Sequence, residues 1–493
     1  MLETDNSSYK QSLKATSLFG GVQVFTILIK IVSSKVAAVL LGPAGMGIYG
    51  LFSQAQNLIK KGTSFGLSSS AVRNISDARG TGDEGRVLTV TSVFRKLVWF
   101  TGLLGLAVCL LGAPLLSKLT FGNNDYIWGF VLLSVSLLVD QLAAGQTAVL
   151  QGLRKYSYMA KATVIGNSVG LLITIPLYYF WKVNAIVPVM VLSSITALIF
   201  SWVYYKKLNL ASVKIDRQTL SIEGNGMVIM GLSISISGIV ETLAAYYLRV
   251  FIGDQGGLDE VGLYTAGFAM VNTYVGLVLT SMGTDYYPRL SEINRDLNKF
   301  NKTISDQMEI VLLLLAPIIT VFLVFAELMI IILYSGEFVA AEGFMFWAIY
   351  ACFFKAVSWC ISYGFLAKGD YKAFIANEIS CQIYSLPLQL YGYTVGGLRG
   401  LGIAYFINIL LYTIQVYLIT RKRYGVRLVG SSVKIFLIQL PIVTACLVLS
   451  QLLDGWLRYA IGLIFVVLAT TISYKEMQKK VDIIQFVKSK IRK

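Results

Sequence analysis

The segment LGPAGMGIY, residues 41–49, falls between two long apolar stretches at residues 13–40 and 47–70. Each stretch exceeds the roughly 20 mostly apolar residues that an α-helix needs to cross a bilayer. Glycine and proline between two such stretches are typical of a turn that separates two helices. The sequence therefore predicts two transmembrane helices joined by a short turn at residues 41–46, with residues 47–49 opening the second helix.

The same pattern continues along the rest of the chain. Hydrophobic residues make up 56% and charged residues only 14%, whereas soluble chains carry roughly a quarter charged residues. We predict an all-α polytopic membrane protein with about fourteen transmembrane helices. Their expected positions are residues 13–40, 47–70, 97–116, 126–150, 160–181, 184–205, 227–252, 261–284, 307–333, 343–366, 373–392, 400–420, 432–452 and 455–474.

The distribution of basic residues gives the expected orientation. The net charge of +16 by itself would suit a nucleic-acid-binding protein. Most of the 42 lysines and arginines, however, fall in alternate loops, and only four fall in the loops of the other side: Lys118, Lys182, Arg399 and Arg458. This bias is the positive-inside pattern of membrane proteins. It predicts that both termini are cytoplasmic, and it argues against nucleic acid as a partner.

The chain resembles itself at an offset of 211 to 216 residues. The triplet GIY at 47–49 returns as GLY at 262–264, and IPL at 175–177 returns as LPL at 386–388. The offset covers six predicted spans, so both copies have the same orientation, as in transporters with two parallel halves. We predict an N-terminal lobe at 1–205, a cytoplasmic linker at 206–226 and a C-terminal lobe at 227–425. Residues 426–493 add two further helices and a basic interfacial tail.

Four short motifs in the chain resemble motifs of a known family. They are LGPAGMGIY at 41–49, FGNNDY at 121–126, VGLY at 261–264 and YPRLS at 287–291. All four are similar to motifs of polysaccharide flippases of the multidrug/oligosaccharidyl-lipid/polysaccharide (MOP) superfamily, in the branch of the O-antigen and enterobacterial-common-antigen translocases. The resemblance covers roughly residues 10–425.

This resemblance implies two six-helix lobes that form a V around a central cavity. It also implies transport of undecaprenyl-diphosphate-linked oligosaccharide from the cytoplasmic to the periplasmic leaflet of the bacterial inner membrane, by alternating access. The implied partners are that lipid-linked oligosaccharide, the membrane lipids and other polysaccharide-assembly proteins. In related flippases, the first, second, seventh and eighth helices line the cavity.

Charged side chains inside membrane spans are costly and usually mark functional cavities. Five bases in the first, second and seventh spans are therefore candidate ligands for a diphosphate: Lys30, Lys35, Lys60, Lys61 and Arg249. The alternative for Lys35 is snorkelling toward head groups. Adjacent side chains on a helix point about 100° apart, so only one of Lys60 and Lys61 is expected to face the cavity squarely. A sixth base, Lys355, lies away from the expected cavity.

Acidic residues in the spans have two interpretations. Glu241 and Asp140 would either couple transport to an ion or proton, or balance nearby charge, and Lys30 is a candidate partner of Glu241. The charge-balancing interpretation is slightly favoured. Glu327 and Glu378 are expected near interfaces.

The sequence favours neither catalysis nor a bound cofactor. It contains no histidine, its five cysteines lack metal-ligand spacing, and it has no G-x-x-x-x-G-K-[ST] motif. We expect no enzyme, metal or cofactor. A cation-coupled multidrug exporter of the same superfamily would have an acidic cavity and twelve spans. A membrane polysaccharide polymerase would need a large outer loop, and the predicted outer loops are short.

Overall fold

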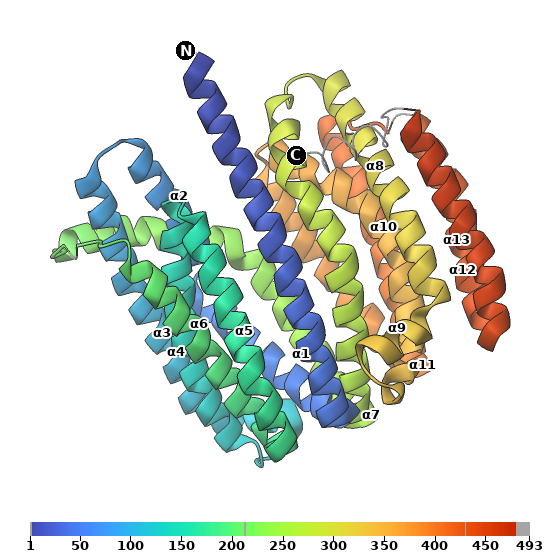
Figure 1. Ribbon diagram of the computed structural model, residues 1–493, viewed down its shortest axis with the longest axis horizontal. Coiled ribbons are helices and arrows are strands. Elements are labelled where there is room, and N and C mark those ends of the chain that lie inside the picture. Colours follow the sequence, from blue (N-terminus) through green and yellow to red (C-terminus); the bar gives the residue numbers. More distant parts are fainter. Residues whose placement is uncertain (1, 212, 429, 480–493) are drawn as a thin grey trace. The chain divides into compact units, whose positions relative to one another are not determined.

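The computed structural model describes residues 2–211, 213–428 and 430–479, and these residues fold almost entirely into helices (Figure 1). Ten helical segments in this part are long and apolar enough to cross a membrane. Four of them, Phe25–Ser64, Tyr156–Lys206, Ser235–Thr273 and Tyr371–Tyr424, each cover two of the predicted spans. The ten segments therefore account for all fourteen predicted spans, and the all-α polytopic fold is confirmed.

The helices follow one another with short connections. Their bounds are α1 Leu2–Ser64, α2 Leu67–Gly80, α3 Glu84–Phe121, α4 Ile127–Gly152, α5 Tyr156–Trp181, α6 Ile186–Lys206, α7 Arg217–Glu292, α8 Leu297–Val324, α9 Ala326–Leu333, α10 Glu342–Ala367, α11 Tyr371–Tyr424, α12 Gly430–Leu452 and α13 Gly455–Gln478. Two 3₁₀ turns, Lys182–Ala185 and Gly336–Ala341, precede α6 and α10.

The chain forms two compact units, Met1–Gly262 and Leu263–Lys493. The first unit holds α1 to α6 and the first part of α7, and α4 packs between α3 and α6 within it (Figure 1). In the second unit, α8 packs against α10, α12 and α13. The expected division into lobes at 1–205 and 227–425 stays a prediction. Residues 480–493, which hold most of the predicted basic tail, lie outside the described residues.

The backbone geometry reproduces the repeat. Both α1 and α7 break at a glycine with nearly the same conformation, Gly42 (φ 66°, ψ −176°) and Gly257 (φ 81°, ψ 179°). Glycine is required there because an extended backbone with positive φ is open almost only to residues without a Cβ atom. The two positions are about 215 residues apart, within the offset of the sequence repeat.

A second pair of backbone positions has the same spacing. Lys182 (φ 47°, ψ −126°) follows α5, and Gly397 (φ 53°, ψ −142°) breaks α11. Gly397 adopts this conformation without strain, whereas Lys182 carries a side chain in a region that favours glycine. The corresponding turns of the two halves thus share a backbone conformation even where the residue differs.

Glycines bring α1 and α7 into close contact within the first unit. A Cβ atom on Gly47 would lie 2.0 Å from the carbonyl oxygen of Leu258, and one on Gly262 would lie 1.9 Å from that of Pro43. The contact is reciprocal, and it joins the two copies of the repeated Gly-x-Tyr motif. Small residues at such crossings allow helices in membranes to pack backbone to backbone.

A second close contact joins the other ends of these two segments. A Cβ atom on Gly66, just after α1, would lie 2.2 Å from the carbonyl oxygen of Gly231 in α7. A Cβ atom on Gly231 would in turn lie 2.2 Å from that of Phe65. The second half of α1 is therefore held against the first part of α7 at both ends, and the candidate site lies along this contact.

Buried and half-buried polar groups fix the second unit. Asp370 precedes α11 and accepts hydrogen bonds from the Ala373 amide at 3.1 Å, Arg423 Nε at 2.6 Å and the Tyr424 hydroxyl at 2.8 Å. The bond from Tyr424 is the first cause of a pKa of Asp370 below its usual value, followed by those from Ala373 and Arg423. The loop before α11 is thereby tied to the end of that helix.

Within the second unit, Arg458 links α13 to α9 and α10. Its side chain is only 2% exposed, and its guanidinium lies 2.7 Å from Glu327 Oε2 and 3.5 Å from Glu342 Oε1. The guanidinium also lies over the rings of Phe346 and Tyr459. The sequence places Arg458 among the loop charges, but the structure places it in the first turn of α13 as a buried partner of two acids.

Candidate functional site

The candidate site lies in the first unit, where the second half of α1 packs between α4 and α7. Two adjacent bases of α1, Lys60 and Lys61, point to different neighbours. Lys60 Nζ lies 3.6 Å from Asp140 Oδ2 of α4, and Lys61 Nζ donates to the carbonyl oxygen of Gly238 of α7 at 3.1 Å. The divergence follows from the 100° between successive side chains of a helix.

Lys60 belongs to a polar network with α4. Asp140 also accepts a hydrogen bond from Gln56 Nε2 at 3.1 Å, and the same amide nitrogen lies 2.9 Å from Ser136 Oγ. Gln56 and Lys60 are one helical turn apart and therefore share the face of α1 that meets α4. Asp140 is positioned to balance the charge of Lys60, and this arrangement leaves Lys60 less available to an anionic ligand than Lys61.

Lys61 belongs to the contact with α7. Its ammonium is exposed, and Gly238 presents no side chain that would hinder the approach to its carbonyl oxygen. Two turns earlier on the same face, Gln54 Nε2 donates to the carbonyl oxygen of Thr242 at 3.3 Å. An ammonium has three N–H donors, so one bond to Gly238 leaves Lys61 able to bind an anion.

Arg249 is the buried base of this region, with 6% of its side chain exposed. Its Nη1 donates to the carbonyl oxygen of Ala245, one turn earlier in α7, at 3.1 Å. Arg249 lies 11 residues beyond Gly238, so about 16 Å of helix separates it from the level of Lys61. Lys61, which contacts α7 at Gly238, and Arg249 therefore stand at two levels along the first part of α7.

The remaining predicted residues are placed as follows. Lys30 is exposed on the first half of α1, and Glu241 is exposed on α7. No ion pair joins these two residues in the part of the chain that the structure describes. Lys35 is half-buried and borders an apolar groove of about 560 Å³ between α1 and α5, beside Ile175, Pro176 and Tyr179. The position of Lys35 in the sequence does not indicate that it packs beside α5.

Residues predicted away from the cavity also find partners. Glu327 pairs with Arg458, as described above. Glu378 accepts hydrogen bonds from the Tyr412 hydroxyl at 2.5 Å and from Asn377 Nδ2 at 3.2 Å, which joins the two parts of α11. Lys355 is half-buried on α10.

Two residues of the site escaped the sequence analysis. Gln54 and Gln56 link α1 to α7 and α4, yet an isolated glutamine in an apolar stretch carries less signal than a charge. Their positions relative to Lys61 and Lys60, seven and four residues earlier, place them on the same two faces. This helical spacing is the feature of the sequence that could have identified the two glutamines as part of the site.

Comparison with known proteins gives a family match over most of this region. The family described as "Polysaccharide biosynthesis protein" matches residues 36–342, which include the candidate site residues Lys60, Lys61 and Arg249. The lipid III flippase of Escherichia coli (strain K12) is 22% identical over 408 residues, which cover 79% of this chain and 94% of the flippase. A putative O-antigen transporter of Shigella flexneri is 22% identical over 411 residues, covering 80% and 94%.

Solved structures share the fold. An inward-facing multidrug resistance transporter of the MATE family and MOP superfamily matches with a TM-score of 0.69 and 16% identity, over 82% of this chain and 94% of its own. The lipid II flippase MurJ in an inward closed conformation matches with a TM-score of 0.62 and 14% identity, over 96% and 100%. The chain therefore has the fold shared by these transporters.

Proposed function

Because this chain belongs to the polysaccharide biosynthesis protein family, matched over residues 36–342, we propose that it is a flippase for a lipid-linked oligosaccharide. The proposed cargo is an oligosaccharide on an undecaprenyl diphosphate carrier, taken from the cytoplasmic to the periplasmic leaflet of a bacterial inner membrane. The names of the two relatives, a lipid III flippase and a putative O-antigen transporter, support this class of cargo. The positive-inside pattern supports an orientation with both termini cytoplasmic.

The observation that carries the proposal is the presence of cations inside two packed spans. Lys61 lies in the span Phe25–Ser64 and Arg249 in the span Ser235–Thr273. Lys61 lies in the last turn of its span, whereas Arg249 is buried well inside its span, where a charge is costly unless it serves a polar pathway. A diphosphate supplies oxygens for the point charge of Lys61 and for the forked donors of Arg249.

The two depths suggest an order of contacts. Lys61, nearer the predicted cytoplasmic end, binds the diphosphate first, and Arg249 receives it about 16 Å further along α7. In this proposal Lys30, which is exposed on the first half of α1, binds the same group, and Lys35 and Lys60 make secondary contacts. The conformational change exchanges these contacts while the sugars pass through the wet interior. A cation-coupled exporter would place carboxylates, not bases, along this path.

A genetic complementation experiment tests the proposal. In a strain that lacks its own flippase for a surface polysaccharide, and whose cargo this chain accepts, the chain should restore that polysaccharide. Lys61→Ala and Arg249→Ala should abolish it while the amount of protein in the membrane is maintained. Lys118→Ala is the matched control, because it removes an exposed lysine at the far end of α3. Full activity of both site variants, or equal loss in the control, would overturn the assignment of the site.

A further inference from the structure

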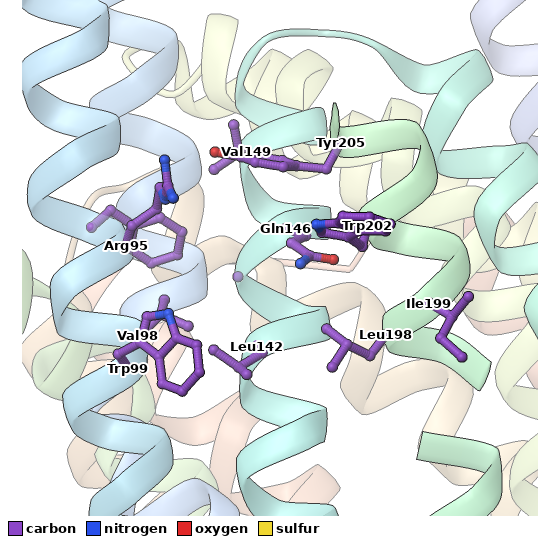
Figure 2. A pocket seen from close by; sticks show the side chains of 12 residues that line it. Arg95, Val98, Trp99, Leu142, Gln146, Val149, Leu198, Ile199, Trp202 and Tyr205 are labelled. Carbon is purple, nitrogen blue, oxygen red and sulfur yellow. The ribbon is translucent and has the colours of Figure 1, made fainter. Parts of the chain in front are cut away.

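A groove in the first unit lies apart from the candidate site. It opens between α3 and α6, which both pack on α4, and has a volume of about 500 Å³ (Figure 2). In Figure 2, Arg95 and Trp99 of α3 stand on one side, Trp202 and Tyr205 of α6 on the other, and Gln146 of α4 lies between them. The residues that line it do not include any from α1 or α7 among those described.

The polar groups of this groove are mostly hydrogen-bond donors. No ion pair involves Arg95 within the described part of the chain, and the described lining residues include no acid. Gln146 Oε1 accepts from Ser201 Oγ at 2.5 Å, so its amide nitrogen is the group left for a ligand. The buried Tyr205 hydroxyl interacts with the Arg95 guanidinium, although the pair does not have the geometry of an ordinary hydrogen bond.

The rim of the groove combines aromatic rings with a second cation. The Trp99 and Trp202 side chains are 51% and 50% exposed, which in a membrane protein is typical of indoles at the level of the lipid head groups. Lys206, the last residue of α6, holds its ammonium 5.2 Å from the centre of the Trp202 ring. The two cations lie nearer the ends of α3 and α6 than the two indole rings do. This arrangement fits a molecule with acyl chains and an anionic head group.

The position of the groove along the helices indicates which leaflet it meets. Arg95 lies near the start of the predicted span at 97–116, and Trp202 and Lys206 lie at the end of α6. Both ends adjoin the basic loops that the positive-inside pattern places in the cytoplasm. Anionic lipids of the cytoplasmic leaflet attract basic residues at this level.

We propose that this groove binds the head group of an anionic phospholipid of the cytoplasmic leaflet, such as phosphatidylglycerol. The guanidinium of Arg95 pairs with the phosphate through two N–H donors, and the Gln146 amide adds a further donor. The volume of about 500 Å³ is sufficient for a lipid head group. The site is separate from the proposed transport path, so it goes beyond the proposed function.

Native mass spectrometry of the purified full-length chain in detergent tests the proposal directly. The protein is titrated with phosphatidylglycerol or with zwitterionic phosphatidylcholine, and the bound lipids are counted. Arg95→Gln should lower the preference for phosphatidylglycerol about fivefold, as expected for one lost basic contact at a membrane surface. Arg86→Gln is the matched control, because it removes an exposed charge from the same helix outside the groove, and it should leave the preference unchanged.

Two further measurements make the outcome decisive. Arg95→Lys keeps the charge and loses the forked donor, so it should bind phosphatidylglycerol more weakly than the wild type and more tightly than Arg95→Gln; it also serves if Arg95→Gln does not fold. Equal preference in Arg95→Gln and the wild type, or equal loss in Arg86→Gln, would overturn the proposal. So would displacement of the bound lipid by undecaprenyl diphosphate through Arg95, because the groove would then belong to the cargo. None of these readouts depends on transport.

Discussion

The reciprocal glycine contact between α1 and α7 makes a sharp quantitative prediction. In Gly262→Ala, the new Cβ atom would stand 1.9 Å from the Pro43 carbonyl oxygen, whereas real Cβ atoms essentially never approach an atom within 3.0 Å. The two helices must therefore separate by about 1 Å, since the atom in the way belongs to the backbone. Overpacking of this kind costs about 1 to 3 kcal/mol.

A matched alanine variant isolates this cost. Gly226 lies in the same helix α7 with no atom within 4 Å of its would-be Cβ, so Gly226→Ala should gain up to about 1 kcal/mol of helix propensity. The difference in stability between Gly262→Ala and Gly226→Ala then reports the steric term, about 1 to 3 kcal/mol. Gly47→Ala, which faces the Leu258 carbonyl oxygen, should behave like Gly262→Ala.

Thermal unfolding in detergent measures the difference. The five cysteines are all free and buried, so a thiol-reactive dye reports the loss of packing. The apparent midpoints of Gly47→Ala and Gly262→Ala should fall below that of the wild type, and that of Gly226→Ala should equal or exceed it. If all three variants unfold together, α1 and α7 are not in backbone contact at these glycines and the reasoning fails.

Three further predictions concern other parts of the chain. Lys182→Gly should relieve backbone strain worth about 1 kcal/mol and thereby raise the unfolding midpoint, and an unchanged or lower midpoint would contradict the positive φ at this residue. Because hydrogen bonds, first that from Tyr424, lower the pKa of Asp370, its contribution to stability should be complete above about pH 4 and disappear as the pH falls through that lowered pKa. Asp370→Asn should flatten this acid limb of a pH–stability curve, and a curve identical to that of the wild type would be inconsistent with the prediction. Arg458→Met should lower the free energy of unfolding by about 2 to 3 kcal/mol, which is less than the loss expected on breaking a fully buried ion pair, because Glu327 is 37% exposed. The double variant Arg458→Met/Glu327→Gln should recover part of this loss. Additive losses in the double variant would argue against the pairing.

The fold was largely predictable because it depends on local properties of the sequence. Long apolar stretches identify spans without knowledge of their neighbours, and the motifs at 41–49 and 261–264 identify the family that the comparison confirms over residues 36–342. Helix ends were harder to predict. At Gly42 the structure breaks α1 into two helical parts, where the sequence predicts the turn, but the single non-helical residue makes the break shorter than the predicted turn.

The site was predictable only in part because its contacts join distant segments. The divergence of Lys60 and Lys61 follows from helix geometry, but their partners Asp140 and Gly238 depend on tertiary packing across 80 or more residues. The groove at Arg95 was not anticipated, because a base at the end of a span counts as a loop charge in a topology argument. Only the packing of α3 and α6 on α4 reveals its neighbours.

Transport by the purified protein is the most direct test of the central claim. Vesicles are prepared with undecaprenyl-diphosphate-linked oligosaccharide in both leaflets, and a membrane-impermeant glycosidase is added outside. With the wild-type chain present, the enzyme should digest the whole pool of lipid-linked oligosaccharide, whereas in vesicles with Arg249→Ala it should digest only the outer leaflet. Digestion limited to the outer leaflet in the presence of well-folded wild-type protein, with several oligosaccharides tried as cargo, would contradict the account.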